Sequence, residues 1–207
     1  MRLSDYINES SYELDNFNDL IHKNCRPYLS LIGNNNPIMR GMRTADRLGI
    51  KDVRKDRRPL GMDKEDANVL NDWLQRKGHC RRDKSVLCSY DSETADNFGF
   101  VHYIFPIGSF RYSWIEARDI NGNHNPTSWH GNTVEAWIAD QKKEANRDDR
   151  LILSRLRMPF EYYFHTDEGY SEMMTKRYEC WIECDKYYNA MIDMYSWEGG
   201  KLVRDEE

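Results

Sequence analysis

The sequence lacks the residue strings that mark the commonest nucleotide-binding and hydrolytic sites. Its 207 residues contain no GxGxxG, no GxxxxGK[ST], no GxSxG and no HExxH pattern. These absences exclude the ordinary dinucleotide-binding, phosphate-loop, serine-hydrolase and zinc-protease sites. Any catalytic function must therefore rest on residues that are dispersed along the chain.

Long apolar runs are also missing. No stretch approaches the roughly 18 to 20 uninterrupted apolar residues that a membrane span requires, and the N-terminal residues contain no apolar signal core. We therefore expect a protein with no membrane partner, located in the cytoplasm. At 207 residues the chain is longer than a typical domain but short of the size at which a core must split. This length favours a single domain over residues 1–207.

Cysteine is sparse and scattered. The five cysteines form no CxxC pair, which argues against a disulfide framework or a zinc ribbon. We expect reduced thiols and no metal site.

The net charge of −5 argues against a protein that coats nucleic acid through its overall field. Basic residues nevertheless gather between Arg40 and Arg58, and a second basic run extends from Arg76 to Lys84. One interpretation of these runs is an ordinary solvated surface. The other is a positive edge that binds a ligand carrying phosphate groups.

The first 33 residues have the apolar spacing of helices, interrupted at Cys25-Arg26-Pro27. Other segments predict helices over 63–77 and from Asp91 or Ser92 to 98, and strands over 38–42, 85–89, 101–107 and 110–120. The last two strands are joined by a Gly108-Ser109 turn. Residues 121–170 are interpreted as an insertion, with helices over 134–145 and 150–156. This order of elements predicts an α+β fold.

Residues 177–184 alternate as a strand does, with Glu179, Trp181 and Glu183 on one side. This strand completes a set of three separated elements. The first is Arg40-Gly41 on an early strand, and the second is the middle strand that ends in Cys88-Ser89-Tyr90. Glu179 is the third.

In these elements the sequence resembles the arginine-serine-glutamate class of mono-ADP-ribosyltransferases, and within it a group of small phage-encoded proteins. The resemblance extends from about Ile38 to Tyr188. It is carried by the strings MRGM (39–42), VRKDRRP (53–59), DW (72–73), SVLCS (85–89) with Ala95 and FG (98–99), IFPIG (104–108), and Glu179 with CDKYY (184–188). It implies a split β-sheet core with an N-terminal helical segment (1–33) and a helical insertion (121–170). It also implies transfer of ADP-ribose from NAD, with release of nicotinamide, to a host protein or nucleic acid in the host cytoplasm.

The resemblance also implies roles for individual residues. Arg40 would hold the ribose and phosphate of NAD, and Gly41 would let the backbone approach the ligand closely. Ser89, with Cys88 and Tyr90 around it, would orient the nicotinamide ribose. Glu179 would bind the ribose 2′-hydroxyl and stabilise developing positive charge. We expect Arg40, Ser89 and Glu179 to line one cleft.

Two further arginines are expected to contact the pyrophosphate or the acceptor. Arg54 and Arg57 lie in the basic stretch 53–59, and a dinucleotide carries about two negative charges that need nearby donors. They complete the set of predicted ligand-binding residues.

The sequence departs from the pattern of this family at two positions. Cys88 stands where the first serine of a Ser-Thr-Ser string is expected. Arg177 lies two residues before Glu179, where arginine-modifying members carry Glu or Gln, and its positive charge would repel an incoming guanidinium. The acceptor is therefore not expected to be an arginine side chain, which leaves Ser, Thr, an acidic side chain, a nucleobase or RNA.

A different class of function remains open. Aromatic residues make up 13% of the chain, and several lie in the insertion. If they were exposed together with the basic edge, the protein would be a non-enzymatic phage-type inhibitor that binds a host protein or nucleic acid.

Overall fold

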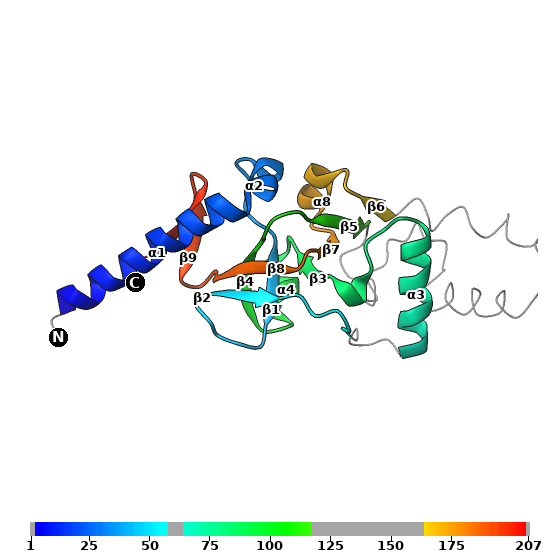
Figure 1. The fold of residues 1–207 in the computed structure, drawn as a ribbon, viewed down its shortest axis with the longest axis horizontal. Coiled ribbons are helices and arrows are strands. Elements are labelled where there is room, and N and C mark those ends of the chain that lie inside the picture. Colours follow the sequence, from blue (N-terminus) through cyan, green and yellow to red (C-terminus); the bar gives the residue numbers. More distant parts are fainter. Residues whose placement is uncertain (1–2, 58–63, 117–163, 206–207) are drawn as a thin grey trace, which may run out of the picture. The chain divides into compact units, whose positions relative to one another are not determined.

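A computed structural model describes residues 3–57, 64–116 and 164–205 (Figure 1). The described part is mixed α and β, with extensive antiparallel sheet, which confirms the predicted α+β class. The chain divides into two compact units, each made of separate segments. Unit 1 comprises Met1–Val53, Asp91–Phe110 and Cys184–Glu207, and unit 2 comprises Arg54–Tyr90 and Arg111–Glu183.

Unit 1 contains four antiparallel strands of the sheet, in the order β2-β8-β4-β1. Its strands are β1 (Met39–Met42), β2 (Leu48–Asp52), β4 (Phe100–Pro106) and β8 (Lys186–Met191). A separate hairpin is formed by β9 (Tyr195–Glu198) and β10 (Lys201–Arg204). The helices of this unit are α1 (Leu3–Asn24), α2 (Arg26–Ile32) and α4 (Ser92–Asp96).

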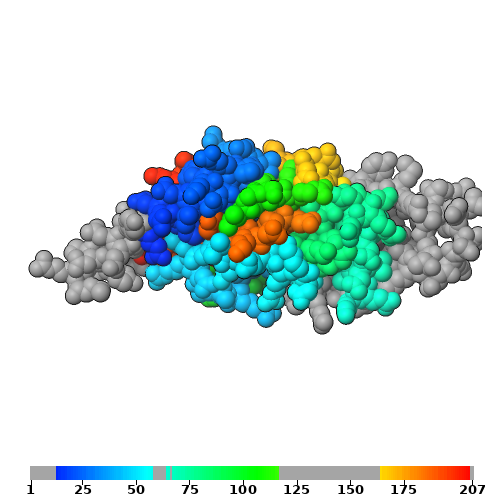
Figure 2. Space-filling model, in the orientation of Figure 1, coloured from blue at the N-terminus to red at the C-terminus, as the bar shows by residue number. Residues whose placement is uncertain are grey.

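The predicted break between the first two helices is confirmed. Cys25 separates α1 from α2, and Pro27 stands in the first turn of α2, where its missing N–H costs no helical hydrogen bond. The side chain of Asn18 on α1 donates to and accepts from the backbone of Leu202 on β10, at 3.0 and 2.9 Å. These two bonds fix the long helix against the hairpin (blue and red in Figure 1), and in Figure 2 the blue residues of α1 and α2 form one continuous surface.

Unit 2 contains four antiparallel strands in the order β3-β7-β5-β6. Its strands are β3 (Val86–Ser89), β5 (Arg111–Ile115), β6 (Phe164–Thr166) and β7 (Glu179–Glu183). The helices are α3 (Lys64–Arg76), the short 3-10 helix η1 (Arg82–Lys84) and α8 (Tyr170–Lys176). One face of the sheet packs on α3 through a core that includes Leu70, Trp73, Leu74, Cys80, Ile115, Phe164 and Trp181.

Several of these assignments extend or correct the predictions from sequence. Strands β4 and β5 were expected as neighbours joined by a turn, but β4 pairs with β1 and β8, whereas β5 pairs with β6 and β7. The predicted insertion ends in strand β6, which pairs with β5 and places Phe164 in the core. Strands β2, β8, β9 and β10 were not predicted. Strand β5 is described only to residue 115, and the helices expected over 134–145 and 150–156 lie outside the described residues.

None of the helices in the described ranges is long and apolar enough to cross a membrane.

Candidate functional site

Ser89 and Glu179 are directly opposite partners on neighbouring antiparallel strands. The register of β3 and β7 pairs Leu87 with Trp181, Cys88 with Cys180, and Ser89 with Glu179. Since side chains alternate along a strand, Ser89 and Glu179 project from the same face of the sheet as Trp181, and the two cysteines project from the other face. The structure therefore brings together two of the three residues on which the transferase resemblance rests.

Glu179 is buried, which is unusual for a carboxylate. Its Oε1 accepts a hydrogen bond from Nη2 of Arg82 at 2.5 Å, and the side chains of Arg82 and Glu179 are only 4% and 10% exposed. The guanidinium of Arg82 also lies 5.8 Å from the centre of the Trp181 ring, within the range of a cation–π contact. A buried charge is costly unless it is paired, and Arg82 supplies an ionic partner for Glu179 at this position.

Arg82 was not recognised as a site residue from the sequence. It lies in the second basic run, whose other charged members lie nearer the surface: Lys77 and Lys84 are exposed and Arg81 is half-buried. No local pattern distinguishes Arg82, because its partner Glu179 is 97 positions away. Its position next to the predicted strand 85–89 was the only available indication.

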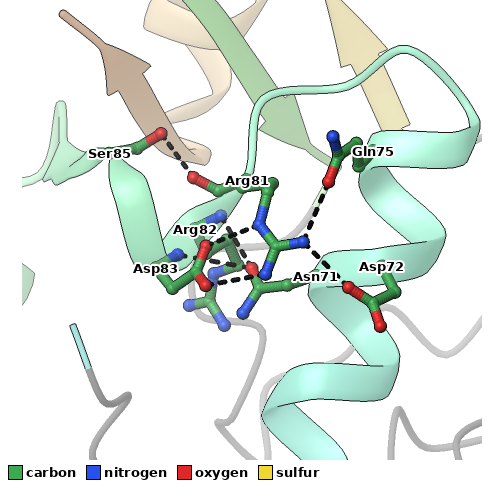
Figure 3. Close-up of polar contacts among 7 residues, drawn as sticks. All are labelled: Asn71, Asp72, Gln75, Arg81, Arg82, Asp83 and Ser85. Carbon is green, nitrogen blue, oxygen red and sulfur yellow. Dashed lines mark hydrogen bonds and ion pairs between the residues drawn. The ribbon is translucent and has the colours of Figure 1, made fainter. Parts of the chain in front are cut away.

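The short helix η1, which carries Arg82, is held against α3 by the α3 side chains Asn71, Asp72 and Gln75 (Figure 3). Oδ1 of Asn71 accepts the backbone N–H groups of Arg82 and Asp83, at 2.9 and 3.3 Å. The guanidinium of Arg81 contacts Asp72, Gln75 and Asp83 at 2.8 to 3.0 Å. Asn71 is 2% exposed. The backbone of η1 is therefore fixed by the buried amide of Asn71. The ion pairs and the hydrogen bond of the Arg81 side chain add to this.

Cys88 and Cys180 lie on the opposite face from Ser89 and Glu179 and are both buried. A hydrogen bond from the Cys180 thiol to Cys88, together with burial, raises the pKa of Cys180 well above its ordinary value. Sγ of Cys88 lies 3.5 Å from the backbone carbonyl of Val86. Cys88 thus packs as a small core residue. Among residues 88–90, it is Ser89 whose side chain shares a sheet face with Glu179.

Tyr90 and Arg177 are positioned by α8. The hydroxyls of Tyr90 and Tyr170 lie 2.6 Å apart, which connects the end of β3 to the first residue of the helix. Arg177 ends α8 in the left-handed conformation with φ of 58°, and its side chain is exposed. An exposed arginine therefore stands two residues before Glu179.

Arg40 and Gly41 belong to β1 of unit 1, whereas Ser89 and Glu179 belong to unit 2. The expectation that all three site residues line one cleft stays a prediction. Arg40 is half-buried and pairs in register with His102. For Gly41 the structure supplies a local reason that needs no ligand: a Cβ atom there would lie 2.0 Å from the carbonyl oxygen of Ala95 in α4.

The two arginines expected to contact phosphate differ in their surroundings. The side chain of Arg54 is exposed. Arg57 is half-buried, and its backbone N–H donates to the carbonyl of Asp83 at 3.0 Å, which places it next to η1 and its Arg82. Arg57 is therefore the better placed of the two relative to Glu179.

Within the described ranges, no group of three or more His, Cys, Asp or Glu side chains is arranged to hold a metal ion. Comparison of the chain with protein-family models, with curated proteins and with solved structures found no match.

Proposed function

We propose that this protein transfers ADP-ribose from NAD to a macromolecular acceptor and releases nicotinamide. The observation that carries the proposal is the pairing of Ser89 with Glu179 on one sheet face, with Glu179 held by Arg82.

The reaction breaks the bond between the ribose C1′ and the nicotinamide nitrogen, and nicotinamide leaves with the bonding electron pair. Positive charge then develops on the ribose, as it does in glycoside hydrolysis. A fixed, poorly solvated carboxylate stabilises this charge more effectively than water does, because no solvent has to reorganise. Glu179 fits that role through its burial and its ionic partner, and the neighbouring Ser89 hydroxyl fits a role in orienting the ribose.

The acceptor completes the reaction when its nucleophilic atom forms a bond to C1′ and gives up a proton. The exposed Arg177 next to Glu179 favours an acceptor that is not a guanidinium, because like charges repel. Arg57, close to Arg82, is a candidate donor to a pyrophosphate oxygen, and Arg40 remains a candidate for the ribose and phosphate of NAD.

The test is incubation of the purified chain with NAD labelled in its adenylate half, with and without cell extract. Nicotinamide release and a labelled macromolecule are the expected results. A parallel thermal melt with NAD measures binding alone, since a ligand of the folded state raises the melting temperature as its concentration increases. The proposal fails if millimolar NAD neither raises the melting temperature nor yields nicotinamide.

The second candidate, a non-enzymatic inhibitor of a host macromolecule, is favoured by one feature of unit 1. Phe98 and Phe100 are 49% and 45% exposed, and Phe100 pairs in register with Met42, next to the exposed Arg43. Exposed aromatic side chains beside a basic loop can bind a protein or a nucleic acid. Absence of any effect of NAD, together with loss of partner binding in Phe98→Ser and Phe100→Ser variants, would favour this function.

A further inference from the structure

We infer that Arg82 is a positioning residue for Glu179 and that Asn71 sets the position of Arg82. The inference rests on the proposed function, because a role in positioning requires that Glu179 act on the ribose. It adds two residues that neither the family pattern nor the sequence motifs include.

The first step concerns the geometry of the ion pair. An arginine and a carboxylate commonly meet through two parallel hydrogen bonds, which use the planar guanidinium fully. Here one nitrogen, Nη2, contacts Oε1 of Glu179, and Nε and Nη1 of Arg82 are buried with no hydrogen-bond partner among the described residues. Buried N–H groups without partners are costly. Arg82 therefore adds less to stability than a fully bonded guanidinium would, and its one hydrogen bond is directed at Glu179, which is the role that we assign to it.

The second step concerns what fixes the guanidinium. Arg82 begins η1, and its backbone N–H is bonded to the buried amide oxygen of Asn71. Figure 3 shows Asn71 reaching the backbone of η1, while the guanidinium of Arg81, the residue before η1, contacts Asp72 and Gln75 on α3. Trp181 lies under the guanidinium. Arg82 therefore has little freedom to follow Glu179 if the carboxylate turns, and the carboxylate must adopt the orientation that Arg82 imposes.

The third step links this arrangement to catalysis. A displacement of about 1 Å in a reacting group can cost about 10²-fold in rate while substrate binding is kept. Loss of Arg82 should therefore lower kcat and leave the KM for NAD nearly unchanged, since Arg82 is too buried to be a major contact of the dinucleotide. Arg82→Lys keeps the charge but not the planar guanidinium that lies over Trp181, so its kcat should lie between those of the wild type and Arg82→Gln.

The experiment measures nicotinamide release at a series of NAD concentrations for the wild type and three variants. Arg82→Gln is expected to lose about 10²-fold in kcat, and Arg82→Lys about tenfold, each with a KM within about twofold of the wild type. Arg111→Gln is the matched control, because Arg111 lies in the same unit, is 51% exposed and pairs with Asp167. Arg111→Gln should keep the wild-type kcat. Thermal melts establish that each variant is folded, and Arg82→Lys provides the readout if Arg82→Gln does not fold.

The outcomes separate the two proposals. An active wild type whose kcat is unchanged in Arg82→Lys and Arg82→Gln would overturn the positioning role and leave the transferase intact. An equal loss in the Arg111 control would also overturn it, because the effect would not depend on Glu179. A wild type that neither binds nor consumes NAD would overturn the proposed function, and the positioning role with it.

Discussion

Gly41 lies so close to Ala95 that a Cβ atom on residue 41 would approach the Ala95 carbonyl oxygen to 2.0 Å, and Cβ of Phe98 to 2.8 Å. Strand β1 and the end of α4 thus pack closely together at Gly41 because this residue has no side chain. The obstacle on the Ala95 side is backbone, which cannot rotate away as a flexible side chain can. This contact explains why glycine follows Arg40 without reference to a ligand.

Gly41→Ala is accordingly expected to lower the free energy of unfolding by about 1–3 kcal/mol, the usual cost of overpacking. The matched control is Gly49→Ala on β2, where the nearest atoms to the added Cβ belong to the side chain of Asn189, with Oδ1 at 3.1 Å. That side chain can shift by a few tenths of an ångström, so the loss should be smaller. Urea unfolding of both variants checks the prediction, and similar losses at the two positions would contradict it.

Replacement of Glu179 by Gln separates a catalytic carboxylate from a structural one. Glu179→Gln keeps the shape of the side chain but removes the charge that would stabilise the ribosyl cation, so nicotinamide release should fall by about 10²-fold or more. Affinity for NAD should change far less, because the charge acts mainly in the transition state.

The control for this prediction is Glu183→Gln at the other end of the same strand. Glu183 is half-buried and pairs in register with Arg111 rather than with Ser89. Its variant should keep near-normal activity. Thermal melts of both variants identify any loss that comes from unfolding. Equal activity in the Glu179 and Glu183 variants would mean that Glu179 does not act on the ribose.

Local sequence signals predicted much of the secondary structure of this chain. The break at Pro27, the helix that follows Asp63 and the strand that ends at Ser89 each depend on neighbours within a few positions, and each was found. Strand β8 was missed because its buried residues, four in succession, show no alternation. A strand covered on both faces has no period of two to detect.

The candidate site was predictable only in part, for a related reason. Ser89 and Glu179 follow from a resemblance in the order of motifs, and the register of β3 and β7 then brings them together. Arg82 and Asn71 act through contacts that span 97 and 11 positions and belong to no motif. A buried charge is recognised by its partner and its surroundings, and neither can be read from local sequence.

The buried thiols predict a fall in stability at alkaline pH. Burial raises the pKa of Cys25 from 9.0 to about 12 and that of Cys80 to about 11. In the unfolded chain both thiols lose their protons near pH 9, whereas in the folded chain they remain neutral. The unfolded state then binds fewer protons than the folded state, so the free energy of unfolding must fall as the pH rises.

The contribution of Cys25 is fully present below pH 9 and is lost as the pH approaches about 12. Melting temperatures between pH 7 and pH 10.5 should therefore decline above pH 9, and the decline should be shallower in Cys25→Ala, which has no thiol to ionise at that position. Thiol titration at pH 8 should detect little reaction of Cys25 in the folded protein and full reaction in denaturant. A decline of the same slope in the wild type and in Cys25→Ala would assign the alkaline instability to other groups.

The role of Asn71 in fixing the backbone of η1 can be tested without any enzymatic activity. Its Oδ1 accepts two backbone N–H groups, those of Arg82 and Asp83, in a position that is 2% exposed. Asn71→Ala removes the acceptor of both donors, of which the bond from Arg82 is buried and the bond from Asp83 is part-buried, so a loss of about 1–3 kcal/mol is expected. Gln75→Ala is the matched control on the same helix, because Gln75 is exposed and contacts only the side chain of Arg81 at 2.9 Å. Its loss should not exceed about 0.5 kcal/mol, as for most surface positions. Urea unfolding measures both, and comparable losses would show that the buried amide does not hold the turn that carries Arg82.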